Sequence, residues 1–74
     1  MKYKILITEE FEDWLEEETA RSRVQIAKRI ENIQEDGHFG DHKQVKNKVW
    51  ELRWENGRRI YYSFIPTTQV LLLL

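Results

Sequence analysis

Apolar side chains in the first half of the chain recur with the period of a helix. Two stripes at i, i+3 and i+4 spacing predict two amphipathic helices, one beginning after Thr8 and one over about residues 20–35. The first stripe consists of Phe11, Trp14 and Leu15, and the second of Ile26, Ala27, Ile30 and Ile33. Thr8 suits an N-cap, and Gly37 suits the left-handed residue that ends a helix. No proline or glycine-rich linker separates the stripes, so we expect a helical hairpin.

The second half of the chain changes to the composition of strands. Residues 49–54, 58–65 and 69–74 predict three strands, and residues 2–7 predict a short one at the N-terminus. Residues 37–48 hold two glycines, two histidines and three lysines, and we expect a polar loop there. The order β-α-α-β-β-β predicts an α+β fold, in which the helical hairpin packs on one face of a small, mainly antiparallel sheet.

The turn between the two longest strands decides which side chains face the core. A two-residue turn would set Arg53 opposite Ile60 and mix charged and apolar groups on both faces. A three-residue loop pairs Trp54 with Arg58 and puts Gly57 at the left-handed position that such a loop needs. A one-residue slip would invert every side chain, so burial favours the three-residue loop. The apolar face then holds Trp50, Leu52, Ile60, Tyr62 and Phe64, and the polar face holds Glu51, Arg53, Arg59, Tyr61 and Ser63.

Length and composition narrow the class of protein. The 74 residues have room for a single domain, and the absence of cysteine excludes disulfides and thiolate metal sites. Residues 70–74 form the longest apolar run, far below the roughly 20 residues of a membrane span, and the N-terminus is too short for a signal peptide. We therefore expect a cytoplasmic protein without membrane contact. His38, Asp41 and His42 form no recognised metal pattern, so neither metal nor cofactor is expected.

Charge is divided unevenly along the chain. The net charge is −1, but residues 1–41 carry six basic and eleven acidic side chains, whereas residues 42–74 carry six basic and two acidic ones. This asymmetry predicts a basic surface in the second half, although chance explains it equally well from charge alone.

The polar face of the strand pair is the strongest candidate site. Arg53 and Arg59 lie directly opposite each other in the predicted register, with Glu51 and Tyr61 as the next pair. Like charges placed opposite each other destabilise a sheet, and a bound polyanion would relieve that repulsion. The alternative is that both guanidinium groups are solvated or paired with Glu51.

Cleavage of RNA by its own 2′-hydroxyl needs a proton acceptor, cations around the phosphorane and a proton donor. The arginines are always protonated and therefore suit charge stabilisation. Tyr61, or else His38 or His42, could move protons, although loop histidines are more often simply exposed. Four further cations would add salt-dependent affinity for phosphates. They are Lys43, Lys46, Lys48 and Arg58.

Several stretches resemble the HigB-like, phage-derived "addiction module killer" branch of the RelE/ParE toxins. They are Ala-Arg-Ser-Arg-Val at 20–24, Lys-Arg-Ile at 28–30, Asp-Gly-His-Phe-Gly-Asp at 36–41, Val-Trp-Glu-Leu-Arg at 49–53 and Arg-Ile-Tyr-Tyr at 59–62, followed by the apolar end. The resemblance covers nearly the whole chain and implies a RelE-like fold. It also implies the toxin of a type II toxin–antitoxin module, a metal-independent endoribonuclease that cuts mRNA at the ribosome. Its expected partner besides mRNA is a small helix-turn-helix antitoxin.

The active face of that branch matches Arg53, Arg59 and Tyr61, of which Arg59 is the best-supported match. Relatives continue past the last strand with a Gly-Gly-Asp-Lys-like turn and a C-terminal helix, so the resemblance implies that the C-terminal end is missing. Exposed leucines there would favour self-association. They are Leu71, Leu72, Leu73 and Leu74. The alternatives are a ParE-like gyrase poison, or a truncated or decayed toxin that only binds its antitoxin.

Overall fold

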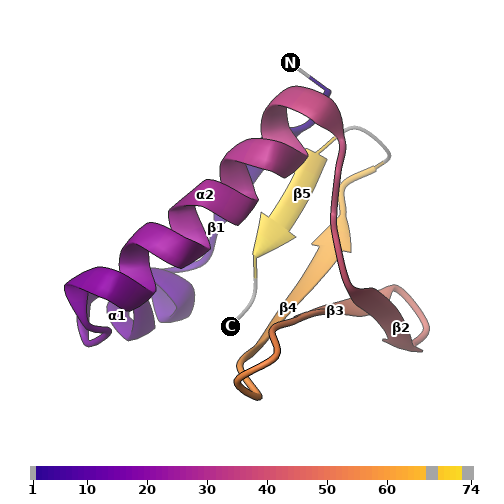
Figure 1. Cartoon of the computed structure of the whole chain (residues 1–74). Helices are drawn as coiled ribbons and strands as arrows, with labels where there is room; N and C mark the ends of the chain where they lie inside the picture. Colours follow the sequence, from indigo (N-terminus) through magenta and orange to yellow (C-terminus); the bar gives the residue numbers. More distant parts are fainter. Residues whose placement is uncertain (1, 67–68, 73–74) are drawn as a thin grey trace.

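The computed structural model describes residues 2–66 and 69–72 of the chain, as two helices and a five-stranded sheet (Figure 1). The elements are β1 (Lys4–Ile7), α1 (Glu9–Glu16), α2 (Ala20–Asp36), β2 (His42–Lys46), β3 (Val49–Arg53), β4 (Arg59–Phe64) and β5 (Gln69–Leu72). The predicted α+β fold in the order β-α-α-β-β-β is confirmed, with one strand more than expected.

The additional strand is β2, which lies in the segment expected to be a loop. It pairs antiparallel with β3, and all five of its residues are exposed. An edge strand has a neighbour on one side only, and this one has no side chain to bury. It therefore lacks the apolar alternation by which a strand is recognised in a sequence. A two-residue turn at Asn47 and Lys48 joins it to β3, and Lys48 takes a positive φ of 66°.

α1 begins at the predicted cap, Thr8, and α2 ends at the predicted glycine, Gly37. The hydroxyl of Thr8 accepts a hydrogen bond from the amide of Phe11 at 3.1 Å, and Thr19 caps α2 in the same way through Ser22. Gly37 ends α2 with φ 68°, and its amide donates to the carbonyl of Ile33. These caps satisfy amide and carbonyl groups that a helix end leaves open.

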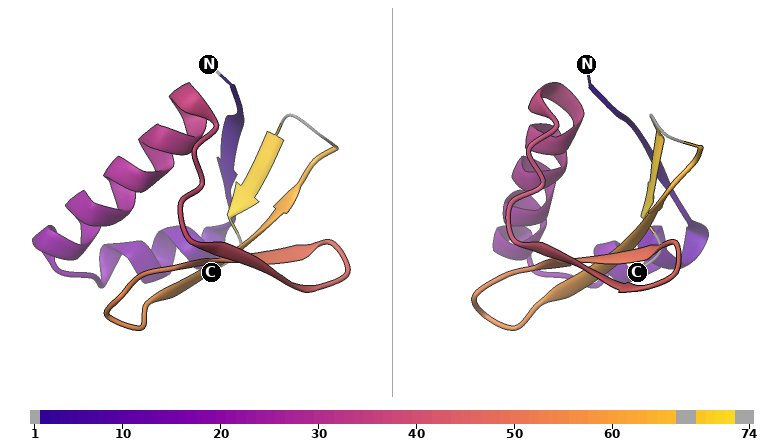
Figure 2. Two further views of the ribbon diagram at one scale, coloured as in Figure 1. Left: turned by 45° about the vertical axis from the view of Figure 1, so that its right-hand side comes forward. Right: turned by 90° about the vertical axis from the view of Figure 1, so that its right-hand side faces the viewer.

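The sheet has the strand order β1-β5-β4-β3-β2, with β5 parallel to β1 and antiparallel to β4 (Figures 1 and 2). The core joins Phe11 of α1 and one stripe of α2 to the sheet. Its fully buried members are Phe11, Ile26, Ile33, Leu52, Ile60, Tyr62, Val70 and Leu72. Ala27, expected in this stripe, is exposed instead, because Ser22, Ile26 and Ile33 occupy the buried side of the helix.

The predicted register of β3 and β4 is confirmed. Arg53 pairs with Arg59 and Leu52 with Ile60, and the amide of Trp54 donates to the carbonyl of Arg58 at 3.1 Å. Gly57 has φ 93°, as the three-residue loop requires. The two faces therefore separate as expected, with one turned toward the helices and the other away from them.

β5 is an internal strand of the sheet and lies between β1 and β4. Leu72 is buried between its neighbours, whereas the side chain of Leu71 and residues 73 and 74, expected to favour self-association, lie outside the described residues. Among the residues that the structure describes, no helix is long and apolar enough to cross a membrane.

Candidate functional site

The sheet presents a polar surface on the side away from the helices. We call it the arginine face and define it by Lys43, Glu51, Arg53, Arg59 and Tyr61. Lys43 of β2, Glu51 of β3 and Tyr61 of β4 are paired in one row. Arg53 and Arg59 are paired in the next row, and the amide of Arg53 donates to the carbonyl of Asp41 at the edge. The predicted catalytic residues are thus neighbours on one face.

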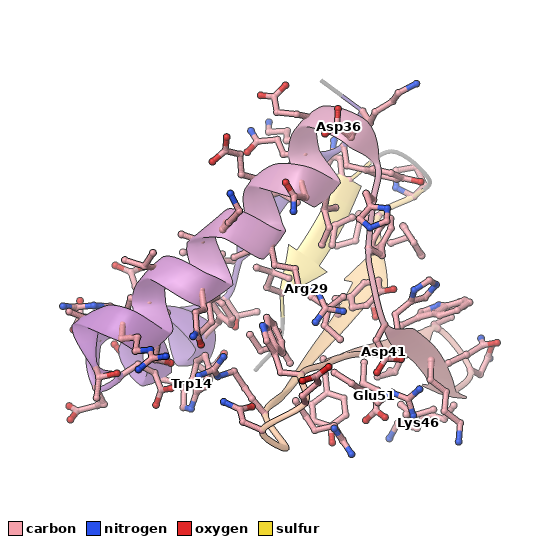
Figure 3. All side chains as sticks on the ribbon, in the orientation of Figure 1. Trp14, Arg29, Asp36, Asp41, Lys46 and Glu51 are labelled. Carbon is pink, nitrogen blue, oxygen red and sulfur yellow. The ribbon has the colours of Figure 1, made fainter. Side chains whose placement is uncertain are left out.

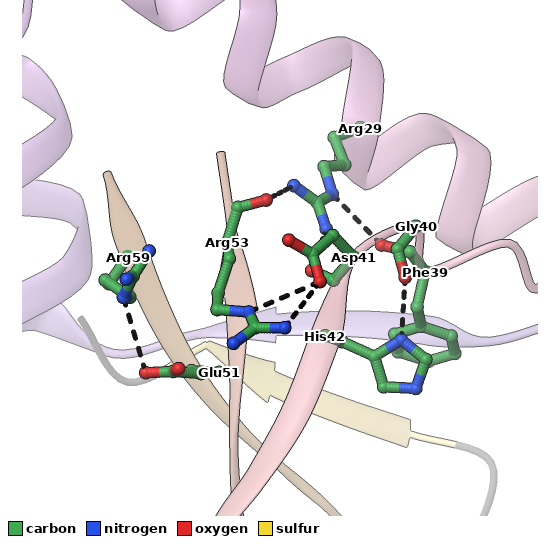
Figure 4. Close-up of polar contacts among 8 residues, drawn as sticks. All are labelled: Arg29, Phe39, Gly40, Asp41, His42, Glu51, Arg53 and Arg59. Atoms are coloured by element: carbon green, nitrogen blue, oxygen red, sulfur yellow. Dashed lines mark hydrogen bonds and ion pairs between the residues drawn. The ribbon is translucent and has the colours of Figure 1, made fainter. Parts of the chain in front are cut away.

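Each arginine of this face has a carboxylate partner. Arg53 donates from Nη2 to Oδ1 of Asp41 at 2.8 Å and from Nε to the same oxygen at 3.3 Å. Nε of Arg59 lies 3.8 Å from Oε2 of Glu51 (Figure 4). The expected pairing with Glu51 therefore holds for Arg59, but Arg53 has a partner that the sequence analysis did not identify. These carboxylates offset the repulsion between the two guanidinium groups.

The carboxylate of Asp41 is surrounded by positively charged side chains. The hydrogen bond from Arg53 lowers the pKa of Asp41, and the charges of Arg53, Arg29 and Arg59 lower it further. Its side chain is nevertheless 62% exposed, and that of Arg53 is 33% exposed. An exposed anion among several arginines occupies a position at which a phosphate oxygen would also be stabilised.

Arg29 of α2 organises this end of the sheet and was not among the predicted site residues. Its side chain extends from α2 toward the segment that carries Asp41 (Figure 3). Its Nε donates to the carbonyl of Phe39 at 3.0 Å, and its two terminal nitrogens donate to the carbonyls of Arg53 and Asp41 (Figure 4). Its guanidinium also lies 4.4 Å from the centre of a Trp54 ring. Burial lowers the pKa of Arg29. The one indication in the sequence was an arginine beside the apolar stripe, between Ile26 and Ile30.

Gly40 makes room for these contacts. Its φ is 73°, and a Cβ added there would lie 3.1 Å from Nη2 of Arg29. A side chain at this position would therefore be strained and would press on the guanidinium. The glycine, Arg29 and the 39–41 segment together fix where Asp41 meets Arg53.

The predicted phosphate-binding cations do not all reach the arginine face. Lys43 belongs to it, and Lys46 and Lys48 lie farther along the same hairpin, beside its turn. Arg58 faces the helices instead: it donates to Ser22 at 2.9 Å and to Gln25 at 3.3 Å, and its guanidinium lies 5.3 Å from a Trp54 ring centre. Its place follows from its pairing with Trp54, which turns both side chains to the helix side.

The candidate proton carriers are separated by the sheet. His42 is paired with Leu52 on the helix side, and its Nδ1 is hydrogen-bonded to the carbonyl of Gly40 at 2.8 Å. His38 lines a pocket beside α2. Tyr61 is 39% exposed on the arginine face and is paired there with Glu51, which is largely buried. Tyr61 and Glu51 are therefore the groups of this face that could donate and accept a proton.

The arrangement combines two guanidinium groups, a carboxylate and a phenol on one surface, which suits the binding of a phosphodiester and the movement of its protons. In the described part of the chain, no group of three or more histidine, aspartate or glutamate side chains is placed to hold a metal ion. Comparisons with protein-family models, with curated proteins and with solved structures find no match.

Proposed function

We propose that this chain is the toxin of a type II toxin–antitoxin module and that it cleaves mRNA at the ribosome without a metal ion. The observation that carries the proposal is the pairing of Arg53 with Arg59 on a sheet face turned away from the helices. The proposal also rests on the resemblance to HigB-like toxins, whose active face matches Arg53, Arg59 and Tyr61. A helix-turn-helix antitoxin would neutralise the toxin.

In the proposed reaction, Arg53 and Arg59 bind the scissile phosphate. Glu51 accepts the proton of the 2′-hydroxyl, the 2′-oxygen attacks phosphorus, and the two arginines stabilise the phosphorane. The bond from phosphorus to the 5′-oxygen then breaks, and Tyr61 protonates that oxygen. The products are a cyclic 2′,3′-phosphate and a free 5′-hydroxyl. Lys43, together with the lysines near the β2–β3 turn, adds affinity for neighbouring phosphates.

A second candidate is a toxin that binds a protein and cuts no RNA, such as a ParE-like gyrase poison or a decayed toxin that only binds its antitoxin. The observation that favours it is the internal pairing of both arginines, Arg53 with Asp41 and Arg59 with Glu51. An acidic protein surface could replace these carboxylates as well as a phosphate could.

Induced expression in bacteria, with primer extension on cellular mRNA, tests the proposal. We expect the chain to arrest growth and to create new mRNA 5′ ends, and we expect both effects to vanish in Arg59→Ala. The matched control is Arg23→Ala, which removes an exposed arginine of α2 and should change neither effect. Growth arrest with intact mRNA would favour a gyrase poison. The absence of arrest would contradict the nuclease proposal and leave the decayed toxin that only binds its antitoxin.

A further inference from the structure

A pocket of 540 Å³ lies between α2 and the turn that joins β3 to β4. Its volume falls in the range of sites for small ligands. Phe39 and Trp54, both half-buried, contribute aromatic surface, and Lys28, Asn32 and His38 contribute polar groups. Because its walls come from the helix side of the sheet, this pocket is separate from the arginine face. We call it the helix-side pocket.

Three polar side chains of the helix-side pocket differ from the arginines around it in being unengaged. Arg29 and Arg58 are bound to carbonyl and side-chain oxygens. By contrast, no hydrogen bond or ion pair within the described residues engages the side chains of Lys28, Asn32 and His38. Asn32 is half-buried as a residue, and no buried side-chain nitrogen or oxygen of the described residues lacks a partner, so its amide remains accessible to a ligand.

The lining matches one class of ligand. A side-chain amide offers a donor and an acceptor in one plane, as the edge of a nucleobase does. The part of each aromatic ring that Tyr62 and Arg29 leave uncovered favours a flat base against it, and lysine favours a phosphate. We propose that the helix-side pocket binds one nucleotide, with its base against Phe39 and Trp54, its base edge hydrogen-bonded to Asn32 and its phosphate beside Lys28.

The pocket adjoins the arginine face at one point. Gly40 lines the pocket, and the next residue, Asp41, holds Arg53. Arg29 also lines the pocket, and it donates hydrogen bonds to the main-chain carbonyls of Asp41 and Arg53. An RNA strand with a phosphate at Arg53 can therefore continue around this edge and place a flanking nucleotide in the pocket. That the nucleotide belongs to a substrate RNA rests on the proposed function, whereas its binding does not require cleavage.

An NMR titration of the whole chain with each of the four ribonucleoside 5′-monophosphates tests the inference. We expect at least one to shift the side-chain amide signals of Asn32 and the indole N–H signal of Trp54. Asn32→Ala should lower the affinity for that nucleotide about fivefold, which is the effect of one lost hydrogen bond. Glu31→Ala, an exposed neighbour on α2, is the matched control and should not weaken it.

Ribose 5-phosphate separates the contribution of the base from that of the phosphate. It should bind at least about fivefold more weakly, because the stacking of the base is lost (about 1–3 kcal/mol per base). Equal binding of ribose 5-phosphate, or no shift at Asn32 and Trp54 with any nucleotide, would overturn the inference. Nucleotide binding without Arg59-dependent mRNA cleavage would leave the pocket standing and contradict the proposed function. Arg59-dependent mRNA cleavage without nucleotide binding in the pocket would support the proposed function and contradict the inference.

Discussion

Two pairs of arginines lie at one end of the sheet and make different kinds of contact. Arg53 and Arg59, on the arginine face, contact carboxylates and remain partly exposed. Arg29 and Arg58, on the helix side, contact carbonyl and neutral side-chain oxygens and lie against Trp54. In the contact of an arginine with a carboxylate, an anionic ligand can take the place of the carboxylate. The contact of an arginine with a main-chain carbonyl offers a ligand no such exchange. The first pair is therefore suited to binding a ligand, and the second to holding the structure.

The largest effect should come from Arg29→Ala. This change removes hydrogen bonds to the carbonyls of Phe39, Arg53 and Asp41 and the contact with Trp54. We expect the free energy of unfolding to fall by about 2–4 kcal/mol in urea denaturation.

The neighbouring variant Lys28→Ala is the control for Arg29→Ala, because Lys28 is exposed and bonds to no described residue. Its free energy of unfolding should stay within about 0.5 kcal/mol of the wild type. Equal stability of the two variants would mean that Arg29 does not hold this end of the sheet.

Arg59→Ala should affect RNA binding more than stability. It removes an ion pair whose closest atoms are 3.8 Å apart and leaves the largely buried Glu51 without that partner. Because Arg59 itself is partly exposed, the free energy of unfolding should fall by only about 1–2 kcal/mol, less than in Arg29→Ala. Affinity for a single-stranded RNA oligonucleotide, measured by fluorescence anisotropy, should fall about tenfold or more. A variant that unfolds readily and still binds RNA would reverse the assignment of the two pairs.

Asp41→Asn should strengthen RNA binding about threefold, because it removes a carboxylate that competes with phosphate for Arg53. Glu16→Gln neutralises an exposed carboxylate of α1, far from both proposed sites in the chain, and reports the effect of net charge alone. If both variants bind RNA equally, Asp41 does not compete. Weaker binding by Asp41→Asn would mean that this carboxylate positions Arg53.

A further effect appears only at alkaline pH. Burial raises the pKa of Tyr62 to about 12, and the charge of Arg29 only partly opposes that shift. The raised pKa means that Tyr62 contributes stability in full below the ordinary tyrosine value of about 10. That contribution should be lost as the pH rises from there through about 12. Tyr62→Phe should remove this part of the alkaline decline in urea denaturation, and an unchanged decline would contradict the burial effect.

The register of Arg53 and Arg59 was predictable because burial of Leu52 and Ile60 on the opposite face excludes any slip. The start of α1 and the end of α2 were predictable because the cap at Thr8 and the left-handed Gly37 act within one turn. The contacts of Arg29 were not, since they join positions up to 24 residues apart and end on main-chain carbonyls. Every residue offers such a carbonyl, so no side-chain pattern marks the contact.

Asp41 was missed for a related reason. Its contact with Arg53 depends on β2, and that strand is polar and fully exposed. Because β2 buries no side chain, its composition is that of a loop. The pattern of apolar residues in the sequence therefore does not indicate that it pairs with β3. The face that carries the candidate site was therefore predictable, but the partner that occupies Arg53 was not.

The most direct test of the central claim is the salt dependence of RNA binding by the arginine face. The logarithm of the association constant for single-stranded RNA should fall linearly with the logarithm of salt concentration. For the double variant Arg53→Ala/Arg59→Ala, the slope should be shallower by about 1.4, which corresponds to two lost phosphate contacts. The Arg21→Ala/Arg23→Ala variant, which removes two exposed arginines of α2, should keep the wild-type slope. An unchanged slope in the Arg53 and Arg59 variant would show that the arginine face does not bind phosphates.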